Sequence, residues 1–187
     1  MQFKQTRLPE VIEVVPVRHG DHRGFFSEVW NRDAMAAQGL HLDFCQDNHS
    51  MSAQSGVLRG LHFQSPPRAQ AKLVRVANGS ILDVAVDIRR GSPRFGQWVS
   101  SVLSAENGRQ LLVPEGFAHG FVTLEPDTHV LYKCTDTYAP ELEGSIRWDD
   151  PDIGIDWGKI QGNLILSDKD ANAAKLADII SPFDFES

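Results

Sequence analysis

Residues 72–90 read KLVRVANGSILDVAVDIRR, and this stretch decides the fold class. Val, Leu and Ile dominate both of its halves, as is typical of strands. Asn78-Gly79 separates the two halves, and this dipeptide is the strongest short signal for a hairpin turn. The stretch therefore predicts two strands joined by a tight turn.

Further short strands are expected on the C-terminal side, at GQWVSSVLS (96–104), RQLLVPEGFAHGFVTL (109–124) and THVLYKCTDTY (128–138). Gly, Pro, Asn and Asp separate these runs, a spacing that favours a β-sandwich or a barrel. The sequence has no internal repeat, low-complexity tract or long linker. A single domain over residues 1–187 is therefore expected.

Two short segments carry helical signals. In NRDAMAAQGL (31–40), Asn31 is a candidate N-cap and Gly39 a candidate stop. In SDKDANAAKLAD (167–178), Ser167 is a candidate N-cap before an Ala-rich body. The sequence thus predicts an all-β fold with a few short peripheral helices.

Composition limits the possible functions. With 187 residues, 41% of them hydrophobic, the chain can bury a sizeable core. A formal net charge of -7 argues against a general nucleic-acid or membrane-surface binder, although a local basic cluster could still hold an anionic small ligand. Cys45 and Cys134 have no metal-site spacing, and we expect reduced core or strand residues of a cytosolic protein. No signal peptide or membrane span is expected, so a cytoplasmic location is predicted.

The stretch VLRGLHFQ, residues 57–64, places charged and polar groups in an apolar strand. Strand alternation predicts two opposite sets of side chains: Leu58, Gly60, His62 and Gln64 on one face, and Val57, Arg59, Leu61 and Phe63 on the other. A guanidinium and an imidazole among Leu and Phe need partners or a ligand, because burying them alone is costly.

Three other stretches combine polar residues with turn signals: GDHRGFFSEVW (20–30), FCQDNHSMS (44–52) and PEGFAHGF (114–121). Taken singly, each has an ordinary structural interpretation. The first would be a turn and a strand, the second a loop of Asx turns, and the third a turn before a structural histidine.

PEGFAHGF resembles the second motif of the cupins, P-x-G-x-x-H, which forms a turn and a strand in small double-stranded β-helix (jelly-roll) barrels. A metal-binding cupin would also carry H-x-H and a glutamate in its first motif. Here that region reads His62, Phe63 and Gln64, with Lys72 downstream. Gln is a poor metal ligand and protonated Lys cannot be one. The motif therefore predicts a barrel without a metal.

Taken together, these segments resemble the dTDP-4-dehydrorhamnose 3,5-epimerase family, in order from about Gly20 to Ala171. The similar stretches also include DVAVDIRRGSPRFGQWVS, LYKCTDTYAPELEGSIRWDDPDIGIDW and LSDKDA. The resemblance implies a metal-free cupin homodimer without an organic cofactor, which acts on a dTDP-linked 4-keto-6-deoxyhexose to make dTDP-4-dehydro-L-rhamnose for cell-surface polysaccharide.

The resemblance also implies roles for particular residues. The C3 and C5 protons of such a sugar are acidic because each lies beside the C4 ketone, so the chemistry needs a base, an oxyanion stabiliser and an acid. His62 would be the base, oriented by Asp170, whereas Asp168 in the same run is expected to be exposed to solvent. Lys72 would stabilise the enolate, and Tyr132 would be the acid on the opposite face.

The family pattern further implies a set of substrate-binding residues: Arg23, Glu28, Gln46, Asp47, Asn48, Arg59, Lys72, His119, Tyr138, Glu143 and Lys169. Tyr138 would stack on the thymine, and Arg59 would bind the pyrophosphate, because a guanidinium matches phosphate oxygens. Arg23 and Glu28 would reach a partner subunit through exchanged N-terminal strands.

Three alternatives remain open at this point. One is a related enzyme that acts at C3 or C5 alone, or a keto-sugar isomerase. Another is a non-catalytic nucleotide-sugar-binding cupin, against which the matched acid and base count. The third is a metal-dependent cupin oxygenase, which the missing first-motif ligands disfavour.

Overall fold

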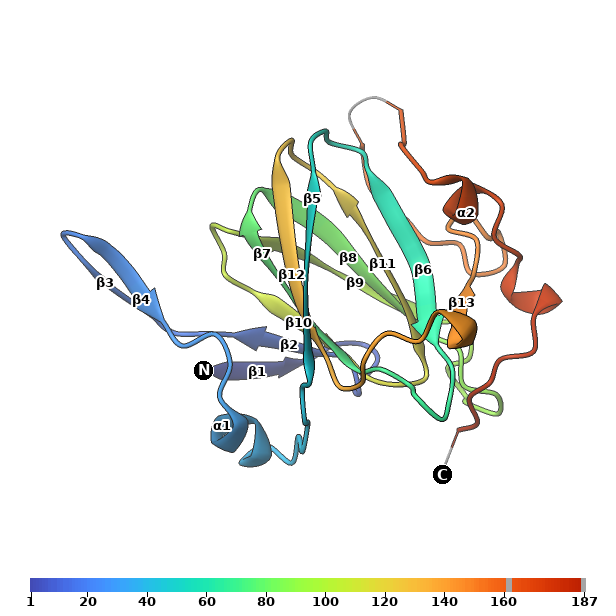
Figure 1. Ribbon diagram of the computed structural model, residues 1–187, viewed down its shortest axis with the longest axis horizontal. Coiled ribbons are helices and arrows are strands. Elements are labelled where there is room, and N and C mark those ends of the chain that lie inside the picture. The colour runs from blue at the N-terminus through green and yellow to red at the C-terminus, as the bar shows by residue number, and fades with distance from the viewer. Residues whose placement is uncertain (161–162, 186–187) are drawn as a thin grey trace.

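The computed structural model describes residues 1–160 and 163–185. Over these residues the chain folds mainly into two β-sheets that face each other as a jelly roll (Figure 1). The larger sheet has the order β1 (Gln2–Gln5), β2 (Ile12–Val15), β10 (Gln110–Val113), β7 (Lys72–Asn78), β12 (Thr128–Cys134) and β5 (Gln46–Ser52).

The smaller sheet lies against the larger one. Its order is β13 (Glu143–Ser145), β6 (Leu58–Gln64), β11 (Phe117–Thr123), β8 (Ser80–Asp87) and β9 (Trp98–Ser104). Neighbouring strands pair antiparallel in both sheets. The expected all-β cupin architecture is confirmed.

The predicted hairpin at Asn78-Gly79 is wrong, although both of its strands exist. Strand β7 pairs with β10 and β12 in the larger sheet, whereas β8 pairs with β11 and β9 in the smaller one. A two-residue type I′ turn needs positive φ at both residues. Only Gly79 has it, with φ +76°, while Asn78 still belongs to β7 and pairs with His129. The chain therefore crosses from one sheet to the other at this glycine.

Apolar side chains fill three layers. Between the sheets, one cluster joins β7, β10 and β12 to β8, β9 and β11 through residues such as Val74 and Ala85. A second cluster covers the outer face of the smaller sheet with C-terminal residues, including Trp157 and Phe183. In Figure 1 this C-terminal segment runs along the outside of β6. A third, smaller cluster packs Met35 against the outer face of the larger sheet.

The helices are shorter than the sequence predicts. The first, α1, spans Arg32–Ala36, and the side chain of Asn31 caps it as expected. The second, α2, spans only Asp168–Ala171 after its Ser167 cap, and a separate 3-10 helix follows at Leu176–Asp178. A further 3-10 helix covers Pro140–Leu142. Among the described residues, no helix is long and apolar enough to cross a membrane.

A two-stranded hairpin projects from the body of the molecule (Figure 1). It consists of β3 (Arg18–Asp21) and β4 (Gly24–Ser27). At its base, the Arg18 guanidinium donates to two backbone carbonyl oxygens of the loop after β9. Phe25 and Phe26 are 61% and 72% exposed, so the hairpin presents apolar surface away from the core.

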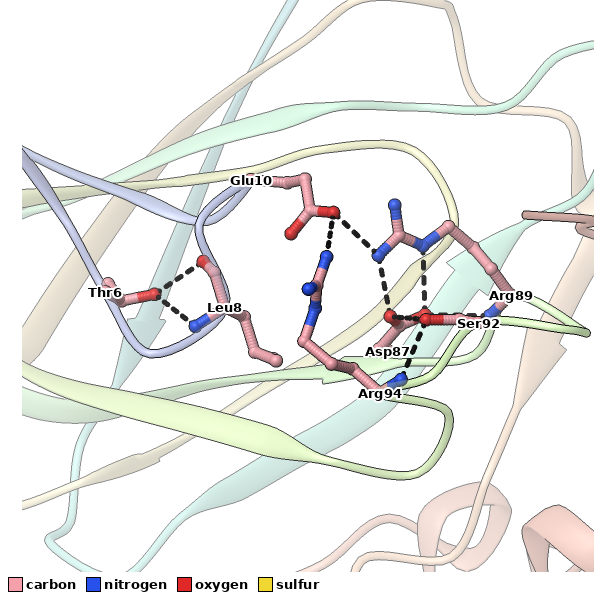
Figure 2. Close-up of polar contacts among 7 residues, drawn as sticks. All are labelled: Thr6, Leu8, Glu10, Asp87, Arg89, Ser92 and Arg94. Atoms are coloured by element: carbon pink, nitrogen blue, oxygen red, sulfur yellow. Dashed lines mark hydrogen bonds and ion pairs between the residues drawn. The ribbon is translucent and has the colours of Figure 1, made fainter. Parts of the chain in front are cut away.

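Charged residues tie the N-terminal segment to the loop after β8 (Figure 2). Asp87 is fully buried and accepts hydrogen bonds from Arg89 and Ser92. Glu10 accepts from the guanidinium groups of both Arg89 and Arg94, at 3.1 and 2.6 Å. The network fixes the N-terminal segment, which leads into β2 and the hairpin, to the end of the barrel.

Candidate active site

The simple alternation predicted for residues 57–64 is wrong, because a bulge in β6 turns Arg59 and His62 to the same side. Opposite β6, His119 pairs with His62 and Phe121 with Arg59, so three residue steps on β6 match two on β11. Leu58, Leu61 and Phe63 consequently share one apolar cluster on the outer face of the sheet. Arg59 and His62 both line a pocket on the inner side.

Glycine is required at this bulge. Gly60 has φ +131°, and a Cβ there would lie 2.5 Å from Gly120 Cα on β11. A side chain would therefore push the two strands apart. Gly60 lets β6 shift its faces while it stays paired with β11.

The pocket lies between the two sheets and has a volume of about 420 Å³. Strands of both sheets and the C-terminal segment line it. Seven of the predicted site residues lie in this one pocket: Arg59, His62, Lys72, His119, Tyr132, Lys169 and Asp170.

His62 and Asp170 form a pair, as the resemblance implies. The atoms His62 Nε2 and Asp170 Oδ1 are 2.6 Å apart, and the aspartate side chain is only 5% exposed. The Ser167 cap of α2 accepts from the Asp170 amide and so fixes the residue. Burial by itself would raise the pKa of Asp170, but hydrogen bonds with His62, Ser167 and the Gly60 backbone lower it below its ordinary value. Asp170 is therefore a stable carboxylate that can orient the imidazole, whereas Asp168 is exposed as predicted.

Lys72 and Tyr132 reach the same pocket from the larger sheet. They lie on the neighbouring strands β7 and β12, where Lys72 pairs with Cys134 and Tyr132 with Val74. Burial raises the pKa of the Tyr132 phenol, so the proton stays on its oxygen at neutral pH. The His62 imidazole on β6 and the Tyr132 phenol on β12 thus face one cavity from opposite sheets.

An adjoining cavity extends the pocket along β5 and β13. Gln46, Asn48, Tyr138 and Glu143 line it together with His62, Lys72 and Tyr132. Glu143 accepts from the Tyr138 hydroxyl at 2.9 Å and pairs with Lys169 at 2.5 Å. Burial would raise the pKa of Glu143, but its bonds with Lys169 and Tyr138 lower it instead. The run QDNHS (46–50) lies within β5, which pairs with β12. It is therefore a strand rather than the loop of Asx turns that its composition allows.

Three predicted substrate-binding residues lie outside this pocket. Strand β5 turns Asp47 to the outer face, where it pairs with Lys133 and is 73% exposed. Arg23 sits at the tip of the β3–β4 hairpin and pairs with Asp21. Glu28 follows β4 and accepts from Asn31.

The cysteine prediction is partly wrong. Cys134 is buried in β12, but Cys45 is exposed and precedes β5. Both have free thiols. Phe44 packs in the third cluster, so the alternation of the chain turns Cys45 outward.

The side chains at the cupin metal position do not fit a metal. Gln64 donates to the backbone carbonyls of Arg68 and Thr137 and accepts from the Ala139 amide, so both ends of its amide are occupied. Lys72 adds a cationic group to the same pocket. Across the described residues, no group of three His, Cys, Asp or Glu side chains could hold an ion.

Asp83 belongs to none of the motifs that indicate the site in the sequence. This residue lies inside β8, points between the sheets and is fully buried, and its carboxylate contacts His119 Nε2 at 2.7 Å. A lone aspartate within the apolar run SILDVAV (80–86) is itself a signal, because an unpaired buried charge is costly. Its partner lies 36 residues away, and only the sheet brings the two together.

The model of the family described as dTDP-4-dehydrorhamnose 3,5-epimerase matches residues 5–178. The chain belongs to this family. It is 54% identical to the dTDP-4-dehydrorhamnose 3,5-epimerase of Pseudomonas aeruginosa over 179 residues, which cover 94% of this chain and 97% of the relative.

Solved structures agree with this family assignment. The dTDP-6-deoxy-D-glucose-3,5-epimerase of Legionella pneumophila, in complex with dTDP-4-keto-L-rhamnose, superposes with a TM-score of 0.95 at 46% identity and covers 100% of this chain and 99% of that one. A 3'-monoepimerase from Streptomyces bikiniensis, in complex with dTDP-quinovose, gives a TM-score of 0.85 at 36% identity, with coverage of 92% and 87%. The proteins of similar structure therefore include ones named for epimerisation at two carbons and at one.

Proposed function

We propose that this epimerase acts on dTDP-4-keto-6-deoxyglucose and inverts C3 and C5 to give dTDP-4-dehydro-L-rhamnose. The observation that carries the proposal is the placement of His62 and Tyr132 on opposite sheets around one pocket, with Lys72 beside them. The names of the relatives in Pseudomonas aeruginosa and Legionella pneumophila support the same reaction.

His62 is the base in this proposal. Its imidazole removes the proton from C3 or C5, and the Asp170 carboxylate stabilises the imidazolium that forms. The resulting enolate carries negative charge on the C4 oxygen, which the Lys72 ammonium neutralises. Tyr132 then donates its proton to the opposite face of the carbon, and the configuration inverts.

The remaining pocket residues bind the nucleotide. Arg59 offers a guanidinium to the pyrophosphate at the rim, where it is exposed. Tyr138 lines the adjoining cavity, is half exposed and can stack on the thymine. Asp47 has no direct role in this arrangement, because its side chain lies on the outer face.

We also propose that the enzyme is a homodimer in which the β3–β4 hairpin of one subunit crosses to the other. Two exposed phenylalanines on a projecting hairpin are typical of a surface that a partner covers. Arg23 at the tip carries a guanidinium that could contribute to the partner's site. The free thiols of Cys45 and Cys134 support a reducing compartment, the cytoplasm.

A 3-epimerase is the second candidate, because the Streptomyces bikiniensis 3'-monoepimerase has the same fold. Incubation with dTDP-4-keto-6-deoxyglucose in D2O, followed by NMR, separates the two candidates. We expect deuterium at both C3 and C5 together with the L-rhamno product. Deuterium at one carbon alone would favour the second candidate. The absence of deuterium at both carbons would indicate a protein that binds the nucleotide sugar without catalysis.

A further inference from the structure

A second histidine–aspartate pair lies beside the first, and the steps above give its aspartate no role. His119 Nε2 is 2.7 Å from Asp83 Oδ1, the histidine side chain is 8% exposed, and Asp83 is fully buried. His119 and His62 are register partners on β11 and β6. The two pairs are therefore neighbours at the inner face of one sheet.

Among the described residues, only one oxygen of Asp83 has a hydrogen-bond partner. Asp83 Oδ2 is buried and has no hydrogen-bond partner among the described residues. A buried carboxylate is costly unless opposite charge compensates it, and the contact with His119 involves Oδ1 alone. The second oxygen leaves negative charge facing the barrel interior, and a cation there would be stabilised.

The Lys72 side chain lines the pocket in that interior. Burial lowers the pKa of Lys72, and charge on Cys134, Glu143 and Asp83 opposes this effect. In the proposed reaction Lys72 acts as an ammonium ion, because a neutral amine has no charge to offset that of the enolate. This role requires a nearby negative charge that favours the protonated form. The titratable groups that share its cavities are Arg59, His62, His119, Tyr132, Tyr138, Glu143, Lys169 and Asp170.

We propose that Asp83 is a positioning residue for the epimerisation: its Oδ1 fixes the His119 ring, and its negative charge holds Lys72 as an ammonium ion toward the C4 oxygen. This role rests on the function proposed above. Asp83 is better suited to it than Glu143, because Glu143 already pairs with Lys169 and Tyr138. Two buried aspartates would then have separate roles. Asp170 orients the base, His62, and Asp83 keeps Lys72, which stabilises the enolate oxygen, positively charged.

The test is the pH profile of kcat/KM for Asp83→Asn, with dTDP-4-keto-6-deoxyglucose as substrate. The amide keeps an acceptor for His119 but removes the charge, so the Lys72 proton is held less strongly. We expect the alkaline limb to move to lower pH by about one unit. The ratio of variant to wild-type kcat/KM should then be about tenfold lower at pH values above the alkaline limb than at pH values below it.

Asp87→Asn is the matched control, because it removes another fully buried carboxylate from the same strand. It should leave the alkaline limb in place whatever it does to stability. Asp83→Glu retains the charge and should lower kcat without moving the limb, which keeps a test available if Asp83→Asn does not fold.

An unmoved limb in Asp83→Asn, or an equal shift in Asp83→Glu or Asp87→Asn, would overturn the role of Asp83. Failure of the proposed function would look different, because wild-type protein itself would then not exchange the C3 and C5 protons.

Discussion

At the scale of single residues, Gly60 decides whether the site exists. Arg59 and His62 are three positions apart, and regular alternation would turn them to opposite faces. The bulge at Gly60 turns both into the pocket and sends Leu58 and Leu61 to the apolar cluster outside. The sequence indicates that these two residues need a ligand, but the bulge depends on pairing with β11, more than 50 residues away, and so could not be predicted from it.

Gly60→Ala should therefore destabilise the protein strongly, by about 3 kcal/mol or more, because strain at positive φ adds to a clash with Gly120. Gly91→Ala is the control: Gly91 also has positive φ, +79°, but a Cβ there meets nothing within 4 Å. It should cost only about 1–2 kcal/mol. Urea unfolding measures both, and equal costs would contradict the close approach of β6 and β11.

At the scale of elements, local signals predicted where strands occur better than how they pair. The runs around 72–90, 96–104 and 128–138 all contain strands, since their alternation and composition are local properties. Whether Lys72–Asn78 pairs with Ser80–Asp87 depends on competing strands that are distant in the sequence. Here the first strand pairs with β10 and the second with β11 instead. The 167–178 helix ends early for a related reason: Leu176 packs into the second cluster as part of a separate turn.

The Asp87 network predicts acid sensitivity at the end of the barrel. Burial would raise the pKa of Asp87, but the hydrogen bonds from Arg89 and Ser92 lower it below its ordinary value. A carboxylate of this kind stabilises the fold above its unfolded pKa of about 3.9, and that contribution is lost as pH falls toward the folded pKa.

Asp87→Asn should cost about 2–3 kcal/mol at pH 7 and make the loss of stability below about pH 4 less steep. The exposed Arg90–Asp184 pair offers a control, since Asp184→Asn should cost less than about 0.5 kcal/mol. Thermal unfolding at pH 7, 5 and 3.5 checks both variants. An acid response of Asp87→Asn identical to wild type would show that Asp87 does not titrate in this window.

At the scale of the whole molecule, the proposed exchange of the β3–β4 hairpin would link assembly to activity. Arg23 lies between β3 and β4 and is not among the residues that line the pocket of its own chain, and the hairpin exposes Phe25 and Phe26. In the proposed dimer these rings are buried against the partner, each contributing about 1.5–3 kcal/mol. Activity should then depend on the dimer.

The double variant Phe25→Ser/Phe26→Ser should weaken dimerisation at least about a hundredfold and lower activity in parallel. Ile180→Ser removes another exposed apolar side chain, 84% exposed and far from the hairpin in sequence, and should change neither property. Light scattering after gel filtration reports the mass, and a wild-type chain that is monomeric at micromolar concentration would contradict the exchanged hairpin.

The most direct test of the account is deuterium incorporation by His62→Ala in D2O, with His41→Ala, an exposed loop histidine, as the control. We expect that His62→Ala incorporates no deuterium at C3 or C5 while it still binds dTDP, and that Tyr132→Phe exchanges protons better than it inverts the carbons. His41→Ala should match wild type in both measurements. Exchange at a near wild-type rate in His62→Ala would contradict the assignment of the base.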